Sequence, residues 1–412
     1  MGRLIALAVV LGVLGATAAS VFLEVVALGQ DYLFTSLPKQ LGLNDLPAWF
    51  AVLLLLIGAG VVILARRLPG STGPGPLTGF HFDLPVAFAP SVLLAALGTL
   101  IFGFVLGPEA PLIVLGSMIG ALAMRGRASD QVRAGQLLGG AAAIGAVFGN
   151  PFITGFMLLE FAAFGLMPAA VIPAVLVALG SGYAIQVGVL GFAGLGTHSL
   201  AVPGLPTYDT IAVGDLAAGF VVAMVAGAIA IGVRSAALII DRRAESRRSL
   251  ALVGAALVTA LALIVAQLAG ASPVMVLFSG NTGMAGLVAQ TSLTLVLVVL
   301  VTKGIAYAAA LGAGLRGGPI FPATFLGVAV AIGASLVLDG VPATPLVAAG
   351  IAATAAGITR LPATSAILGA ILVGGSGAAV APFAILGAIV GLLLRQAADR
   401  KAAPAGPPLP AS

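Results

Sequence analysis

Hydrophobic residues run in long, almost unbroken stretches along this chain, without the regular polar positions that would give a helix or strand a water-facing side. The first stretch covers residues 1–29. Two more, residues 91–105 and 112–124, flank the short segment LGPEAP. Runs of about 18 apolar residues or more are typical of helices that cross a lipid bilayer. Because such runs recur along the whole chain, the pattern predicts an all-α polytopic membrane protein.

The N-terminal stretch has two interpretations. Residues 1–20 contain one arginine, an apolar core and small residues at the end, as a secretory signal peptide does. The apolar character continues through residues 21–29, however, which favours a first transmembrane helix.

The composition excludes several other classes of protein. Of the 412 residues, 60% are hydrophobic and 8% are charged, whereas soluble domains have about 25% charged residues. The absence of cysteine excludes disulfide bonds and thiolate metal sites. No nucleotide-binding loop, HExxH or GxSxG motif is present, so nothing indicates an enzyme, a cofactor or a resident metal.

The charges lie between the apolar stretches and predict a topology, so the net charge of +5 does not point to nucleic acid. Loops at residues 31–45, 198–215 and 339 contain acids and almost no bases. By the positive-inside rule the basic clusters are cytoplasmic, in a multi-pass protein of the inner (plasma) membrane. These clusters are Arg66 and Arg67; Arg125, Arg127 and Arg133; Arg242, Arg243, Arg247 and Arg248; Arg395, Arg400 and Lys401.

The chain also contains an internal repeat. A shift of 211 residues places GPEAPLIVLG (107–116) on GPIFPATFLG (318–327) with five identities, and the same shift places Pro151 on Pro362. Three proline matches at one offset are not expected from composition. We therefore predict two membrane repeats, residues 1–200 and 201–412, the second ending in a short cytoplasmic tail. In transporters, paired Gly/Pro-interrupted segments of this kind indicate the substrate site.

The paired segments here are residues 107–111 and 317–322. Proline disfavours helical geometry in the residue before it, so Gly107 and Ala110 favour extended backbone, and Pro111 suits the first position of a helix. A helix start presents free N–H groups and the positive end of its dipole. Two facing starts are therefore predicted to bind an anion without a buried cation, and weakly enough for the ion to leave.

Glu109 lies between two prolines at membrane depth, where an acid is costly and usually marks an ion pathway or a proton relay. As a carboxylate it can occupy the anion site, and when protonated it can swing away, so it is a candidate gate. The alternatives are a permanently protonated group or a local helix cap. Glu160 is the second plausible intramembrane acid, with a proton role and a structural hydrogen bond both open. Glu24 is interpreted as structural.

These segments resemble the CLC family of chloride channels and chloride/proton exchangers. GPEAP (107–111) resembles the motif G-[KR]-E-G-P, and GGPIFP (317–322) resembles G-x-F-x-P. LPGSTGPGP (68–76) lies where the G-S-G-x-P loop belongs, with Ser71 as its serine and Thr72 as a rival. GNPFITGFMLLE (149–160) and ITRLPATSAILGAILVG (358–374) resemble two further motifs, and all occur in family order.

The resemblance implies a CLC-type fold with two inverted-topology repeats and broken or re-entrant helices. It also implies a homodimer with one pore per subunit, chloride as substrate, and Glu109 as the gating glutamate. Because Pro319 has no N–H group, Ile320 and Phe321 become the expected backbone donors. The anion-binding candidates are Ser71, Thr72, Gly107, Ala110, Pro111, Gly318, Ile320 and Phe321.

Departures from the family pattern leave the mode of transport open. Pro108 and Ala110 replace a basic residue and a glycine, Phe161 stands where exchangers often carry a second acid, and no tyrosine matches the pore tyrosine. We therefore expect a chloride transporter gated by Glu109 with proton antiport, an uncoupled channel, or a fluoride-selective exchanger. A proton-driven carrier of another solute and a non-transporting scaffold are alternatives from other classes. No nucleotide-binding domains follow, so regulation by ATP is not expected.

Overall fold

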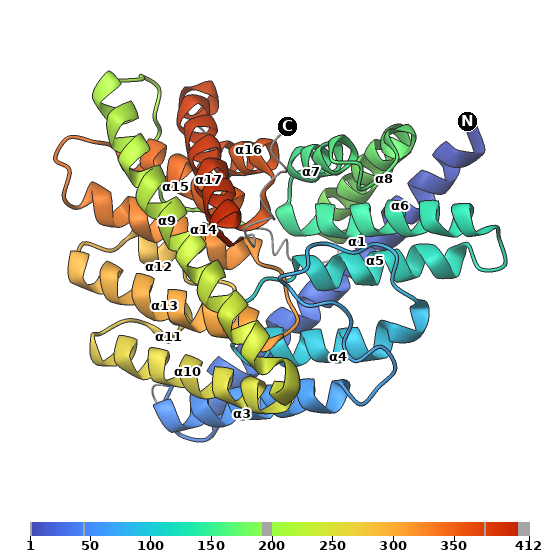
Figure 1. Cartoon of the computed structure of the whole chain (residues 1–412), viewed down its shortest axis with the longest axis horizontal. Coiled ribbons are helices and arrows are strands. Elements are labelled where there is room, and N and C mark those ends of the chain that lie inside the picture. The colour runs from blue at the N-terminus through green and yellow to red at the C-terminus, as the bar shows by residue number, and fades with distance from the viewer. Residues whose placement is uncertain (1, 44–45, 192–199, 375, 403–412) are drawn as a thin grey trace, which may run out of the picture.

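The structure is a computed structural model that describes residues 2–43, 46–191, 200–374 and 376–402. Over these ranges it consists of helices and contains no strand, only an isolated bridge between Gly107 and Gly318. The prediction of an all-α protein is therefore confirmed. Figure 1 shows most helices of the second half (lime to red) on one side of the molecule and most helices of the first half (blue to green) on the other.

Six segments in the described part of the chain are long and apolar enough to cross a membrane. The first lies at the N-terminus, where α1 (Gly2–Asp31) is one continuous helix packed against α6 (Ser129–Phe148) and α8 (Ile172–Ile185). This arrangement favours the interpretation of residues 1–29 as a membrane helix. A second segment, residues 169–190, contains α8, and a third, residues 213–268, contains both α9 (Val213–Ala244) and α10 (Arg248–Leu268). The remaining three correspond to α3 (Ala48–Ala65), α13 (Leu293–Ala313) and α17 (Ala381–Ala402).

Several apolar helices are too short to span a bilayer, which needs about 20 residues. Among them are α4 (Ala89–Leu100), α5 (Glu109–Ala123), α7 (Pro151–Ala163), α14 (Ile320–Ser335) and α16 (Pro362–Leu372). Two of them, α5 and α14, begin within the Gly/Pro-interrupted segments 107–111 and 317–322, as predicted. The remaining α-helices are α2 (Leu37–Gln40), α11 (Pro273–Val276), α12 (Met284–Val288) and α15 (Ala343–Thr359).

The two halves repeat the same helices at the offset found in the sequence. α5 and α14 start at residues 109 and 320, α7 and α16 start at 151 and 362, and α6 and α15 end at 148 and 359, each a difference of 211. The boundary at residues 200 and 201 stays a prediction. The preceding residues 192–199, including His198, and the predicted tail over residues 403–412 lie outside the described residues, as does Asp45.

Each half contains a very close helix pair in which glycines face each other, at positions related by the repeat. A side chain on Gly116 of α5 or Gly139 of α6 would overlap the carbonyl oxygen of the other. The same is true of Gly327 in α14 and Gly350 in α15, at positions shifted by 211. Small residues at a helix interface let the backbones approach and increase the packing contact. These pairs hold the starts of α5 and α14 on rigid supports.

Candidate anion site

The two broken segments meet in the centre of the molecule. The Gly107 N–H donates to the Gly318 carbonyl oxygen at 2.8 Å, and the Gly318 N–H donates back to the Gly107 carbonyl oxygen. This pair of bonds is the antiparallel bridge between the halves. α5 begins two residues after Gly107, and α14 begins two residues after Gly318. Residues 211 positions apart in the sequence therefore form one junction.

The helices begin slightly earlier than predicted. α5 starts at Glu109 and α14 at Ile320, so Pro111 and Pro322 are each the third residue of their helix and Ala110 is helical. Proline is tolerated there because the first-turn N–H groups have no partner within the helix. The N–H groups of Gly107 and Gly318 are used in the bridge, so they are not free to bind an anion. Their assignment to the anion site stays a prediction.

Glu109 projects from the first turn of α5 to the start of α14. Its side chain is fully buried, and its Oε1 atom accepts the Phe321 N–H at 2.8 Å. Its Oε2 atom is buried without a hydrogen-bond partner in the described part of the chain. The carboxylate thus occupies a helix start with one oxygen and leaves the other unsatisfied, which is costly for a buried polar atom.

Glycines at positions 107 and 318 make room for this carboxylate. A Cβ atom placed on either glycine would overlap the Oε2 atom of Glu109. Neither glycine has a positive φ, so the requirement for glycine arises from the side chain of Glu109 and not from backbone geometry. Gly107 and Gly318 are therefore glycines for the same reason, because each lies against the Glu109 carboxylate and leaves no room for a side chain.

Two buried polar residues of α13 were not predicted, and one of them, Tyr307, contacts the junction. The Tyr307 hydroxyl donates to the Pro319 carbonyl oxygen at 2.6 Å, directly before the start of α14. The Lys303 ammonium donates to the carbonyls of Val276, Leu277 and Phe278 at 3.0, 3.0 and 3.3 Å, at the end of α11. Single polar residues in an apolar helix give no periodic signal in the sequence, so their partners could not be foreseen.

The loop after α3 lies against the second half through an arginine. Arg316 donates from Nε to the Thr72 carbonyl at 2.8 Å and from Nη2 to the Gly73 carbonyl at 2.7 Å. Thr72 is buried, and its N–H donates to the Ser91 hydroxyl at 2.6 Å, whereas Ser71 is exposed. Both Ser71 and Thr72 have positive φ. Of the two rivals, Thr72 is therefore the one that faces the interior. Arg316 and Lys303 are both buried, but neither donates to the Gly107–Gly318 junction, so binding of an anion by the helix starts alone stays a prediction.

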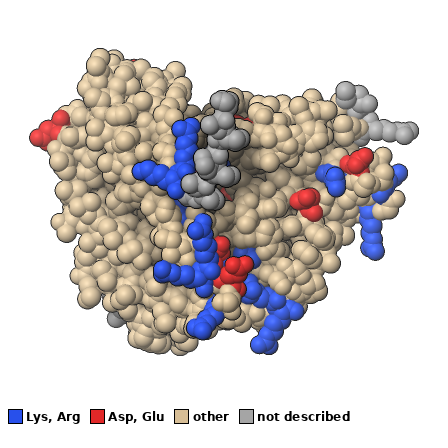
Figure 2. All heavy atoms as spheres, in the orientation of Figure 1, with Lys and Arg blue, Asp and Glu red and all other residues tan. Residues whose placement is uncertain are grey.

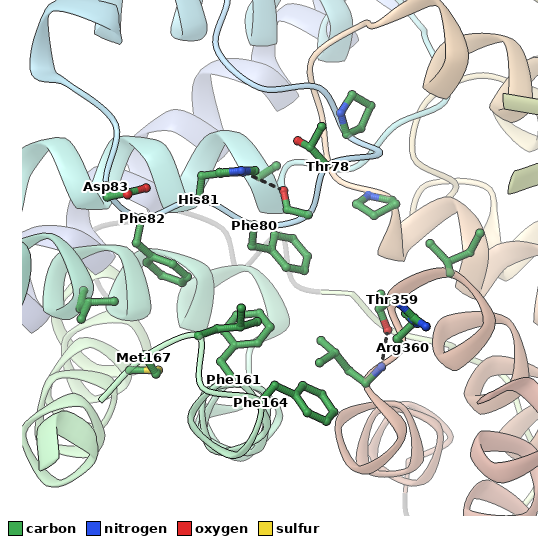
Figure 3. A pocket seen from close by; sticks show the side chains of 18 of the residues that line it. Thr78, Phe80, His81, Phe82, Asp83, Phe161, Phe164, Met167, Thr359 and Arg360 are labelled. Atoms are coloured by element: carbon green, nitrogen blue, oxygen red, sulfur yellow. Dashed lines mark hydrogen bonds between the residues drawn. The ribbon is translucent and has the colours of Figure 1, made fainter. Parts of the chain in front are cut away.

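A wide cavity leads from the surface to the helix starts. Its volume is about 1300 Å³, and its walls include Ala110 of α5 and Pro319 at the start of α14. Figure 3 shows Phe80, Phe82 and Phe161 on one side of this cavity and Thr359 and Arg360 on the other. Its other charged walls are Asp83, Asp130, Arg133, Arg234 and Arg395.

Three of the four arginines that line this cavity share one acid. Asp399 forms ion pairs with Arg395 at 2.8 Å, Arg360 at 3.2 Å and Arg234 at 3.4 Å. Figure 2 shows lysine and arginine side chains in a band over the middle of one face of the molecule and again at one edge, with acidic side chains beside both groups. The cavity itself is lined by more arginines than acids, and such an excess of positive charge raises the local concentration of anions.

Glu160 is bound at a different helix start. Its Oε1 atom accepts the Ala363 N–H at 2.7 Å, and its Oε2 atom accepts the Thr364 N–H at 2.8 Å and also the Thr364 hydroxyl. Both oxygens of this carboxylate are therefore satisfied by the first turn of α16. The contacts are those of a structural hydrogen-bonded cap between helices, one of the two interpretations left open by the sequence.

The comparison with known families gives a match over most of the chain. The family model described as "Voltage gated chloride channel" matches residues 74–396. YfeO of Escherichia coli (strain IAI39), which is named for ion transport, is 28% identical over 356 residues, covering 82% of this chain and 79% of YfeO. YfeO of Salmonella choleraesuis (strain SC-B67) is 32% identical over 149 residues, covering 35% of this chain and 36% of that protein.

Solved structures show the same fold. A slow cyanobacterial Cl⁻/H⁺ antiporter superposes with a TM-score of 0.78 at 17% identity, covering 96% of this chain and 94% of its own. A CLC-type fluoride/proton antiporter superposes with a TM-score of 0.73 at 19% identity and covers 96% of each chain. The predicted CLC-type fold is therefore confirmed.

Proposed function

The chain belongs to the voltage gated chloride channel family, and on this premise we propose that it carries a small anion, chloride first, across a membrane along a pathway that Glu109 closes. The observation that carries the proposal is the Glu109 carboxylate on the Phe321 N–H, with its second oxygen buried and unpartnered. A carboxylate at a helix start occupies the place that an anion would take.

Protonation is the proposed opening step. A neutral carboxyl group has no charge for the start of α14 to attract, so it can leave the Phe321 N–H to the transported anion. Space for the released side chain lies toward the wide cavity, whose walls include the neighbouring Ala110. Acidification should therefore increase the flux of the unmodified protein. The donors to the anion would be first-turn N–H groups, at Ile320 and Phe321 of α14 and Ala110 of α5.

The finer features of the function are also proposals. Chloride is put forward because of the family, and fluoride is the alternative because one structural neighbour is a fluoride/proton antiporter. Proton antiport would need a carrier besides Glu160, whose two oxygens are both held by α16. The homodimer and the inner (plasma) membrane are proposed from the resemblance and from the basic clusters at residues 242–248 and 395–401.

The direct test is efflux from liposomes containing the purified protein, with chloride and external pH recorded together. Chloride efflux that drives proton uptake against a gradient would support an exchanger, and chloride efflux without proton movement would support a channel or uncoupled carrier. If fluoride moves and chloride does not, the anion pathway is retained and chloride is the wrong substrate. If neither halide moves faster than from protein-free liposomes, the proposed function is wrong.

A further inference from the structure

Arg316 brings an unpaired positive charge into the interior next to the proposed pathway. Its side chain is only 9% exposed, and it lies between α13 and α14. None of the ion pairs among the described residues involves Arg316. Removing a charge from water costs several kcal/mol unless a counter-charge or good hydrogen bonds compensate it. An arginine without a carboxylate at this position therefore needs a reason.

Hydrogen bonds to backbone carbonyls compensate part of the cost of burying Arg316. The guanidinium donates to the carbonyls of Thr72, Gly73 and Gly314 at 2.8, 2.7 and 2.9 Å. All three acceptors are neutral, so the charge itself is not matched. A guanidinium has five N–H groups, and these bonds use three of them, which leaves one on each terminal nitrogen. Arg316 thus fastens the loop after α3 and still has donors to offer.

A small cavity lies beside this guanidinium. Its volume is about 30 Å³, and it is lined by Arg316, Gly317 and Thr72 together with Ala110 and Pro111 from the first turn of α5. A site needs only about 10–15 Å³ to hold one water-sized occupant. Pro76, Gly79, His81 and Ala110 line both this cavity and the wide one, so the two adjoin.

The surrounding charges do not neutralise Arg316. The charged groups that act on it at longer range are Arg66, Arg248 and Asp241. Asp241 is already paired with Arg248 at 2.7 Å. The neighbourhood is therefore positive, and the buried N–H groups at the start of α5 add to the same sign.

We propose that Arg316 is an anion-binding residue that holds a small inorganic anion, such as chloride or fluoride, in this cavity before the ion reaches the Glu109 junction. The inference rests on the proposed function. An arginine stays charged throughout the physiological pH range, so the contribution of Arg316 to binding should not depend on pH, whereas passage at Glu109 should. His81 is the other ionisable residue that lines this cavity. The protein would then combine one permanent charge with one titratable gate.

The test is titration of potassium chloride into the purified full-length protein, followed by calorimetry. Arg316→Gln removes the charge and should weaken chloride binding by about tenfold or more, which corresponds to about 1.4 kcal/mol. Thr99→Val is the matched control, because the Thr99 hydroxyl accepts the Arg316 backbone N–H at 3.0 Å and the variant disturbs the same segment without removing charge. Its affinity should stay within about twofold of the unmodified protein.

Equal chloride affinity of Arg316→Gln and the unmodified protein would overturn the inference and leave the proposed function standing. If the unmodified protein binds neither chloride nor fluoride, the proposed function fails and the inference falls with it. Should Arg316→Gln not fold, crystals of the unmodified protein in bromide decide the question by anomalous scattering. Bromide within about 4 Å of the guanidinium is expected. Bromide sites elsewhere only would contradict the inference.

Discussion

Two glutamates of the first half each meet the start of a helix in the second half, but they are bound very differently. Glu109 receives one N–H, from Phe321 in α14, and its second oxygen has no partner in the described structure. Glu160 receives the N–H groups of Ala363 and Thr364 and the Thr364 hydroxyl in α16. Hydrogen bonds to a charged group contribute about 1.5–3 kcal/mol each, so Glu160 is held far more firmly. The number of donors separates a fixed cap from a carboxylate that an anion can replace.

The largest effect, on stability, is expected when the Glu160 carboxylate is removed. Glu160→Ala leaves three donors at the start of α16 without an acceptor, two of them on the buried Thr364, and we expect a loss of about 3 kcal/mol or more in stability. A lower thermal midpoint in detergent would show it. Any protein that folds should keep the pH dependence of chloride flux, since Glu160 does not lie at the junction. A normal midpoint with altered pH dependence would instead favour a proton role for Glu160.

A smaller effect, on transport, is expected from crowding the gate. In Gly107→Ala the new Cβ atom would overlap the Glu109 carboxylate, which is the end of a flexible side chain and can move away. The closed position then becomes less favourable by about 1–2 kcal/mol, within the usual cost of an overpacked site, and flux at pH 7.5 should rise about fivefold to thirtyfold.

The control for this prediction is a double variant. Combined with Glu109→Gln, Gly107→Ala should add little, because both changes act on the same closed state. If Gly107→Ala raises flux by the same factor in both backgrounds, the crowding does not act through Glu109.

The smallest effect is expected when Glu160 loses one of the three hydrogen bonds that it accepts from the start of α16. Thr364→Val removes the hydroxyl that donates to Glu160 and keeps both backbone donors. We expect a loss of about 1 kcal/mol in stability and unchanged chloride flux at every pH. Thermal unfolding and liposome efflux measured on the same preparation check both parts. A loss as large as that of Glu160→Ala would show that the hydroxyl, and not the helix start, holds the carboxylate.

Much of the fold was predictable because prolines and glycines recur at matching positions in the two halves of the sequence. Their constant offset predicted the broken helices, and the missing N–H of Pro319 indicated Phe321 as a donor, the group that now binds Glu109. Pro111 was predicted as the first residue of its helix, but it is the third, because proline is accepted anywhere in the first turn.

The rest depended on contacts between distant parts of the chain. Arg316 binds carbonyls 243 and 244 residues away, and Glu160 binds a helix more than 200 residues away. One arginine before a glycine pair and one acid near a helix end carry no spacing that predicts such partners. For Glu160 the sequence left two interpretations open, and only the count of donors in the structure favours one of them.

The central claim is that Glu109 alone makes passage depend on protonation, and the most direct measurement is chloride efflux from liposomes between pH 4.5 and 8.5 for the unmodified protein and for Glu109→Gln. Because glutamine mimics the protonated group, the variant should give high flux at every pH, whereas the flux of the unmodified protein should rise as pH falls. Equal pH dependence in the two proteins would contradict the account, since some other group would then control the pathway.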